Sequence, residues 1–242
     1  MKFKTIGNYE KPKVLLIHAM FAAAESFLPL VEYLKDKYYV IMPTLDGHSK
    51  VEKGDFLSLK DEADQIMVYL KKNNIDDLEF ILGTSLGAII AFEVYRRNEI
   101  NINRVFLDGA PLFKFPCLLK KICGKKFWKI CCRVRQKPEK ALEKIDELFP
   151  GIGKLMVSVC TQMSEKSCKN LSEACFSFVM PELNEKQQKK IVFMYGTKET
   201  ARLCMGRLKR YKYARILMKE RYNHCGYLLE NPKEYADMLS KG

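Results

Sequence analysis

Long hydrophobic runs are missing from this sequence of 242 residues. No apolar stretch reaches the roughly 18 to 20 residues that a membrane-spanning helix needs, and the opening segment MKFKTIGNYEKPK is charged where a secretory signal would be apolar. We therefore expect a cytoplasmic protein with no transmembrane helix. Histidine is also scarce, and its three residues limit the search for a histidine general base to three positions.

Paired cysteine spacing is absent as well. The chain has nine cysteines, but the number is odd, no two of them form a CxxC pair, and no export signal precedes them. A disulfide framework or a zinc site would normally show such a pattern. We expect reduced, mostly buried thiols, and we expect neither a bound metal nor an organic cofactor.

Acidic residues are few in two basic segments, although the whole chain has a net charge of +13. Residues 114–140 contain ten Lys/Arg against the single acid Glu139, and residues 207–215 contain five with no acid, so the remainder sums to −1. Such a surface can meet lipid headgroups, acidic substrates or nucleic acid, or can simply be solvated. Nucleic acid is the least favoured partner because no recognition motif accompanies the charge.

Short apolar segments alternate with longer helical patterns along most of the chain. The segments lack strict alternation of apolar and polar residues, which is typical of strands buried on both faces of a sheet. They predict a mostly parallel α/β sheet of about seven strands, wrapped by helices such as residues 57–73. The predicted strands are residues 13–18, 38–43, 78–82, 104–108, 191–195 and 214–218, with an added edge strand at 3–7.

One interval interrupts this alternation. About eighty residues separate the strands at 104–108 and 191–195, whereas a crossover connection needs about a dozen. The interval carries helical patterns, one of them opened by Pro138 and one interrupted by a glycine. We predict an inserted helical cap at residues 112–189, placed over the carboxyl ends of the strands, on a core of residues 1–111 and 190–242.

The pentapeptide GTSLG, residues 83–87, lies between a predicted strand and a predicted helix. In that context a G-x-S-x-G pattern indicates a nucleophile elbow, where the chain turns sharply to raise the hydroxyl of Ser85 above the sheet. Side chains at Gly83 or Gly87 would collide with neighbouring backbone. Ser85 is therefore the candidate nucleophile.

A serine needs a base to take its proton, and the base needs a group that orients it. His224 is the preferred base because it follows the last predicted strand, which gives the chain order serine, acid, histidine. For His48, in the turn DGHSK, a structural role in a loop is the favoured interpretation. For His18 we favour packing beneath the loop that follows the first buried strand.

The acid should follow the strand at 191–195. Glu199 stands there in the segment GTKET, where its carboxylate can reach the far nitrogen of the His224 ring. Asp108, after the preceding strand, is the competing acid. Both assignments stay open, with Glu199 preferred.

The GTSLG elbow, the GTKE turn and the NHCGY loop, in this order, resemble the α/β-hydrolase superfamily, specifically its small capped serine esterases and lipases. The resemblance covers residues 12–111 and 190–240 and implies an oxyanion hole formed by the N–H groups of Met20 and Leu86, with Phe21 as the alternate to Met20. The sequence departs from the family at three points. It has His18-Ala19 where His-Gly is usual, Glu199 where aspartate is commoner, and a cysteine rather than a glycine after His224.

The resemblance implies hydrolysis of carboxylic or thio esters through an acyl-enzyme with no cofactor. The same residues would also support carbon–carbon bond hydrolysis or acyl transfer, and a non-catalytic anion-binding module is a remote alternative. We expect a small ester substrate, and an anionic ester would suit the positive charge of the protein. Weak association with an anionic membrane surface is a further hypothesis. The apolar residues of the cap could either line an acyl pocket or pack within the cap, and both roles stay open. These residues are Phe115, Leu118, Trp128, Phe176 and Phe178.

Overall fold

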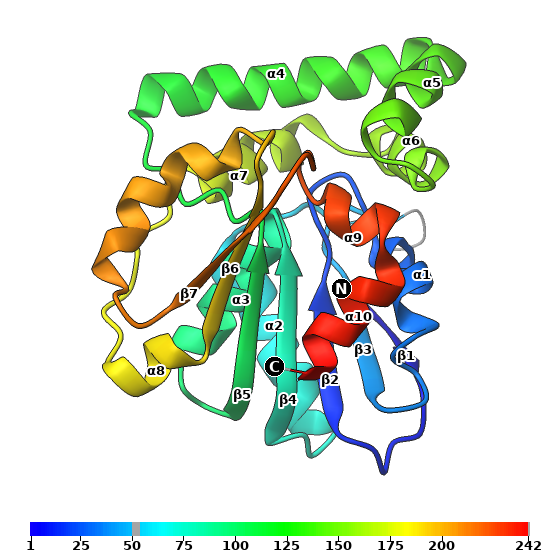
Figure 1. The fold of residues 1–242 in the computed structure, drawn as a ribbon. Helices are drawn as coiled ribbons and strands as arrows, with labels where there is room; N and C mark the ends of the chain where they lie inside the picture. The colour runs from blue at the N-terminus through cyan, green and yellow to red at the C-terminus, as the bar shows by residue number, and fades with distance from the viewer. Residues whose placement is uncertain (50–53, 242) are drawn as a thin grey trace.

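A seven-stranded sheet forms the centre of the protein (Figure 1), in a computed structural model that describes residues 1–49 and 54–241. The strand order is β1-β3-β2-β4-β5-β6-β7; β1 pairs antiparallel with β3, and the other pairs are parallel. The predicted strands and their mostly parallel sheet are therefore confirmed. The strands are Lys2–Ile6 (β1), Lys13–Ile17 (β2), Tyr39–Thr44 (β3), Asp77–Thr84 (β4), Asn101–Asp108 (β5), Ile191–Gly196 (β6) and Arg215–Lys219 (β7).

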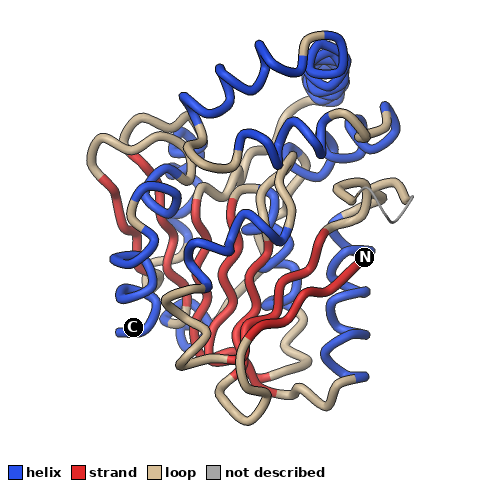
Figure 2. Tube along the Cα trace, turned by 90° about the vertical axis from the view of Figure 1, so that its right-hand side faces the viewer, coloured by secondary structure: helices blue, strands red, loops and turns tan. Residues whose placement is uncertain are grey.

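Both faces of the sheet are covered by helices (Figure 2). On β2, Leu15 and Ile17 join one buried apolar cluster, while Val14 and Leu16 join another on the opposite face. The first cluster includes residues of α2 (Leu59–Lys72) and α3 (Leu86–Arg96), and the second includes residues of α1 (Leu28–Val31) and α10 (Pro232–Lys241). Burial on both sides explains why the strands lack alternation.

Helix α2 shows how the local sequence sets an element. Ser58 caps its N-terminus by accepting a hydrogen bond from the Asp61 N–H at 3.1 Å. Acidic residues occupy the first turn and Lys71 and Lys72 the last, as the helix dipole favours. The helix joins the same apolar cluster as residues of α3 and the sheet through its buried side chains Ala63, Ile66 and Leu70.

Five helices lie between β5 and β6: α4 (Cys117–Gln136), α5 (Pro138–Leu148), α6 (Gly153–Cys160), α7 (Glu165–Phe176) and α8 (Glu185–Lys189). Figure 1 shows α4 lying across the carboxyl ends of the strands, while α8 lies at the opposite end of the sheet. The insertion of a helical cap between these two strands is thus observed, and we use "cap" for α4–α7. Short helices complete the fold: η1 (Ala24–Phe27), η2 (Ala201–Arg210) and α9 (Gly226–Glu230).

The longest helix, α4, continues through Gly124 without a break. Gly124 is buried against α7, where an added Cβ would lie 3.3 Å from the Cα of Lys169 and 3.5 Å from the Cβ of Ser172. The predicted glycine interruption is therefore a site of close helix packing. Six of the nine cysteines are buried, as expected, and the structure pairs none of the nine in a disulfide. None of the described helices is long and apolar enough to cross a membrane.

Candidate active site

Ser85 lies at the turn between β4 and α3 with a backbone φ of 52° and ψ of −112°. A positive φ is unusual for a residue with a side chain, so this turn is strained and must be held by its surroundings. Two hydrogen bonds hold it: the Ser85 N–H donates to the backbone carbonyl of Asp108 at 2.7 Å, and the Ala88 N–H donates to the Ser85 carbonyl at 3.0 Å. The sharp strand-to-helix turn that the sequence predicts at Ser85 is present, and the role of Ser85 as a nucleophile stays a prediction.

Steric contacts explain both glycines of the elbow. A Cβ on Gly87 would lie 2.0 Å from the backbone oxygen of Ile17, and a Cβ on Gly83 would lie 2.2 Å from the oxygen of Gly87 itself. No side chain fits at either position without moving backbone atoms. The spacing of GTSLG is therefore required by the packing of α3 against β2 and β4.

His224 and Glu199 meet across the loops that follow β7 and β6. Glu199 Oε1 accepts a hydrogen bond from the Gly196 N–H at 2.6 Å, which fixes the carboxylate, and Oε2 contacts Nδ1 of the His224 ring directly. The Glu199 side chain is fully buried, whereas the His224 side chain is 31% exposed. The ring rests on Gly109, where a Cβ would come within 2.6 Å of its Cε1. With Nδ1 occupied, Nε2 is the nitrogen left for another partner.

Ser85 and His224 line one cavity of about 190 Å³. Its walls are mostly apolar and come from the loop after β2, from the cap and from α9. Between these two side chains the described structure contains no hydrogen bond; such bonds are often long in free enzymes and shorten when substrate binds. The apolar lining residues include Met20, Phe27, Phe149, Ile152, Met156 and Leu228.

Asp108, the competing acid, has a different partner. Its Oδ2 accepts a hydrogen bond from the hydroxyl of Tyr235 at 2.9 Å, and the carboxyl is buried. Burial, with a smaller contribution from the negative charge of Glu199, raises the pKa of Asp108 from 3.8 to about 7. The geometry therefore places Glu199, and not Asp108, on the His224 ring.

The loop after β2 contains the predicted oxyanion donor Met20, which lines the cavity. The positive φ in this loop falls at Phe21 (φ 64°), so Ala19 does not need the conformation that a glycine would provide. Leu86 is the first residue of α3, and an N–H at this position has no acceptor within its own helix. The assignment of the two N–H groups as oxyanion donors stays a prediction.

His18 and His48 are buried and stack edge to face with ring centroids 5.2 Å apart. The His18 ring bonds to the carbonyl of Ala19 at 2.8 Å and accepts from the Leu45 N–H at 3.0 Å, which is the packing role expected beneath the loop. Burial lowers the pKa of His18 to about 3 and that of His48 to about 4, so both rings are neutral at pH 7. His48 bonds to the carbonyl of Asp46 at 2.9 Å.

Most of the apolar residues that were candidates for an acyl pocket pack against other side chains instead of lining the cavity. Phe115 and Phe176 stack on each other with centroids 4.6 Å apart, and Phe178 packs on Phe92. Arg135 lies over the Trp128 ring, and Leu118 is 70% exposed on the surface. Their place in the cavity wall is taken by residues that the sequence did not single out, namely Phe149, Ile152, Met156, Leu228 and Leu229.

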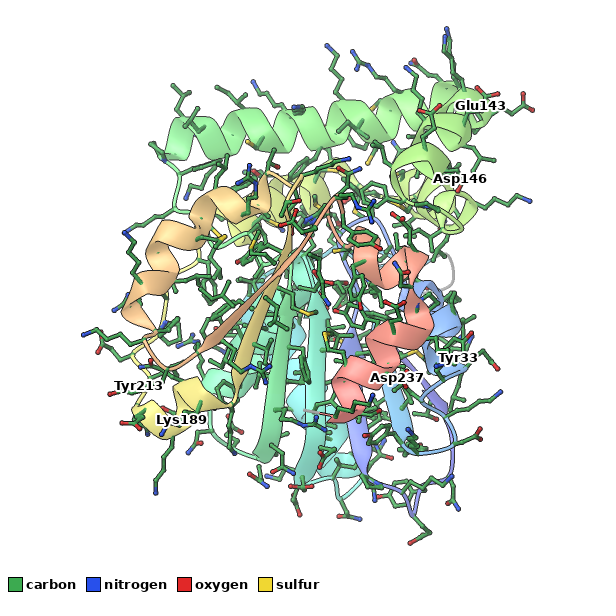
Figure 3. All side chains as sticks on the ribbon, in the orientation of Figure 1. Tyr33, Glu143, Asp146, Lys189, Tyr213 and Asp237 are labelled. Atoms are coloured by element: carbon green, nitrogen blue, oxygen red, sulfur yellow. The ribbon has the colours of Figure 1, made fainter. Side chains whose placement is uncertain are left out.

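A hydrogen bond orients the part of the cap that forms this wall. The Gly153 N–H at the start of α6 donates to Asp146 Oδ1 of α5 at 2.9 Å, and Figure 3 shows Asp146 beside α6. This bond connects α5 to α6, the helix whose Met156 lines the cavity with Ser85. Among the residues that the structure describes, no group of three or more His, Cys, Asp or Glu side chains is arranged to hold a metal ion.

Solved structures provide the comparison, because no family model and no curated protein matches the sequence. The chain is similar to an α/β-hydrolase family protein from Desulfitobacterium hafniense, with 19% identity, a TM-score of 0.76 and 99% of both chains covered. A carboxylesterase structure from Nitrososphaera gargenis gives 16% identity, a TM-score of 0.74 and coverage of 99% and 92%. An enol-lactonase from Burkholderia xenovorans gives 15% identity and a TM-score of 0.73, with 99% of this chain and 95% of the enol-lactonase chain covered. The chain has the α/β-hydrolase fold.

Proposed function

We propose that this protein is a serine hydrolase that cleaves carboxylic or thio esters, with Ser85 as nucleophile, His224 as base and Glu199 as the orienting acid. The observation that carries the proposal is the contact of Glu199 with His224 Nδ1 beside a strained Ser85 in the same cavity. The similar structures include esterases, an enol-lactonase and a thioesterase domain, and all of these names denote acyl chemistry. No cofactor takes part in this reaction.

The reaction begins with transfer of the Ser85 hydroxyl proton to Nε2 of His224 as Oγ forms a bond to the substrate carbonyl carbon. Glu199 holds the imidazolium that results. The N–H groups of Met20 and Leu86 would bind the oxyanion, with Phe21 as the alternate donor. His224 then gives its proton to the departing alcohol or thiol, and a water molecule releases the acyl group from Ser85 by the same steps.

The size of the cavity favours short acyl groups. Its volume of about 190 Å³ is below the roughly 300 to 1,000 Å³ of pockets that hold drug-sized ligands. The apolar walls suit a hydrocarbon chain. We therefore infer a preference for esters of small acids.

A fluorophosphonate probe tests the nucleophile. It should label the wild-type protein and leave Ser85→Ala unlabelled, and the variant should lose hydrolysis of nitrophenyl acetate. Ser26→Ala is the matched control, because Ser26 also lines the cavity but its hydroxyl donates to the carbonyl of Ala23 at 2.8 Å. Labelling that persists in Ser85→Ala would disprove the assignment.

A panel of nitrophenyl esters with about two to sixteen acyl carbons tests the substrate class. We expect the highest kcat/KM at the short end. The same site would also serve carbon–carbon bond hydrolysis or acyl transfer to another acceptor. Probe labelling without turnover of any ester or thioester in the panel would favour those alternatives.

A further inference from the structure

The outer face of α4 carries cations that no acid neutralises. The helix contains no acidic residue, and its side chains on the outer side point away from the rest of the molecule, several of them ending in nitrogen (Figure 3). Within the described residues, Lys120 pairs with Glu173 and Arg135 bonds to cap carbonyls, whereas the other cations of α4 form no ion pair. These exposed cations are Lys121, Lys125, Lys126, Lys129 and Arg133.

Large apolar side chains are exposed on the same helix. Leu118 is 70% exposed, Ile122 is 53% exposed and Leu119 is 46% exposed. At 100° per residue, Leu118, Ile122, Lys125 and Lys129 fall on one stripe, on the side opposite to the buried residues of α4. The helix therefore has a buried side that packs on the rest of the cap and an outer side that is both apolar and basic.

A groove between α4 and α7 extends this surface. Its volume is about 690 Å³, and its walls include Leu118 and Ile122 together with Lys121, Lys125 and Lys169. Glu165 is the one acid in its wall. The groove is wide enough for a headgroup or part of an acyl chain, and its charge suits an anion.

We propose that the outer face of α4, defined by Leu118, Leu119, Ile122, Lys121, Lys125, Lys126, Lys129 and Arg133, docks on an anionic membrane surface. Charge complementarity identifies the partner as anionic, and the exposed leucine and isoleucine side chains identify it as a lipid surface, because apolar side chains can enter the boundary between headgroups and acyl chains. Phosphate recognition in nucleic acid would use the cations and leave these apolar residues unexplained. None of the eight residues lines the cavity that contains Ser85.

Co-sedimentation with lipid vesicles tests this proposal independently of catalysis. The full chain is mixed with vesicles of phosphatidylcholine alone or with about 30% phosphatidylserine, at about 0.1 M and about 0.5 M NaCl. We expect binding only to the anionic vesicles, and weaker binding at the higher salt. Leu118→Ser/Ile122→Ser and Lys125→Glu/Lys129→Glu should each lower the partition coefficient by roughly tenfold or more.

Controls on α2 match both kinds of change. Val68→Ser removes a side chain that is 65% exposed, and Lys71→Glu/Lys72→Glu changes the net charge by the same amount as the α4 pair. Both should bind anionic vesicles as the wild type does, and circular dichroism verifies that every variant is folded. Equal loss in the control and α4 charge variants, or no binding to anionic vesicles, would overturn the proposal. The proposal would also be overturned if the protein bound duplex DNA but not vesicles, and if Leu118→Ser/Ile122→Ser left the DNA binding unchanged.

Discussion

At the scale of single residues, the contact between Glu199 and His224 is the feature with the largest expected effect. Glu199→Gln keeps the shape of the side chain and removes the charge that holds the ring and stabilises the imidazolium. We expect kcat to fall by a factor on the order of 10³ to 10⁴ with the fold retained. Steady-state kinetics measure this change, and a mild effect here together with a large one in Asp108→Asn would move the role of the acid to Asp108.

Asp108 gives a second prediction, about stability and pH. Its pKa is about 7 in the folded protein and near 3.8 when exposed, so over this interval the folded state holds a proton that the unfolded chain has lost. The contribution of Asp108 to stability therefore falls as pH rises from about 4 to about 7. Asn cannot titrate and still offers an oxygen to the Tyr235 hydroxyl.

The free energy of unfolding of Asp108→Asn, relative to wild type, should therefore rise between about pH 5 and about pH 8, by on the order of 2–3 kcal/mol. Urea unfolding at the two pH values measures the difference. Titrating groups that do not interact with Asp108 cancel in the comparison because both proteins contain them. A difference that does not change with pH would contradict the assigned pKa.

Much of the candidate site follows from the sequence, because Ser85, Glu199 and His224 are placed by strand ends that local pattern identifies. The backbone of the loop after β2 could not be predicted in the same way. Its positive φ lies at Phe21, which has a side chain, and only tertiary packing forces such a conformation. The hydrogen bond between Tyr235 and Asp108 joins residues 127 positions apart, and no local pattern indicates it.

At the scale of elements, the turn from β4 into α3 depends on the close approach of α3 to β2. Gly87→Ala would place a methyl group 2.0 Å from a backbone oxygen, so backbone must move. We expect a loss of roughly 1–3 kcal/mol in the free energy of unfolding and a loss of probe labelling at Ser85. Gly206→Ala in η2 is the control, since an added Cβ there meets nothing within 4 Å. Thermal unfolding of the two variants gives the test, and equal melting temperatures would contradict this account.

Helix α6 should set the acyl length through Met156, which lines the cavity. Met156→Ala enlarges the apolar wall, so kcat/KM for an octanoate ester should rise relative to acetate by roughly tenfold. Phe178→Leu is the control, because Phe178 packs on Phe92 and is outside the cavity wall. The ratio of the two rate constants is the measurement, and the same ratio in wild type and Met156→Ala would remove α6 from the proposed acyl site.

The sequence predicts the elements of the sheet better than the arrangement of the cap. The five inner strands, β2 to β6, are short apolar segments that are buried on both faces, which gives them a clear pattern, whereas the edge strands β1 and β7 are more exposed. Helix α4, in contrast, has apolar residues on its buried side and at Leu118 and Ile122 on its outer side. Periodicity alone cannot say which of these faces the core, so the wall formed by Phe149, Ile152 and Met156 required the tertiary structure.

At the scale of the whole molecule, most of the net positive charge comes from residues 114–140, which include α4 at one end of the sheet. The cations of α4 do not line the cavity, so they act on a substrate only through the long-range field, over about 10 Å at 0.1 M salt. A carboxylate-bearing ester should lose kcat/KM between about 0.02 and 0.5 M NaCl, while a matched neutral ester does not.

The variant Lys125→Gln/Lys126→Gln/Lys129→Gln tests the source of this effect. It should weaken the salt dependence of the anionic ester and leave the neutral ester unchanged. If both esters respond to salt in the same way, or if the three changes have no effect, the basic segment does not attract the substrate and is only a solvated surface.

The insertion of the cap also determines when the site can exist during synthesis. Ser85, the proposed nucleophile, leaves the ribosome before the cap. Glu199 and His224, which follow strands β6 and β7, leave after it, and Tyr235 comes later still. Strands β5 and β6 pair directly although the whole insertion separates them in the sequence. The sheet can therefore be completed only after the insertion has been synthesised. A chain released before residue 224 would hold the serine without its base. The proposed triad therefore requires synthesis through residue 224, and termination within the cap leaves Ser85 without both of its proposed partners.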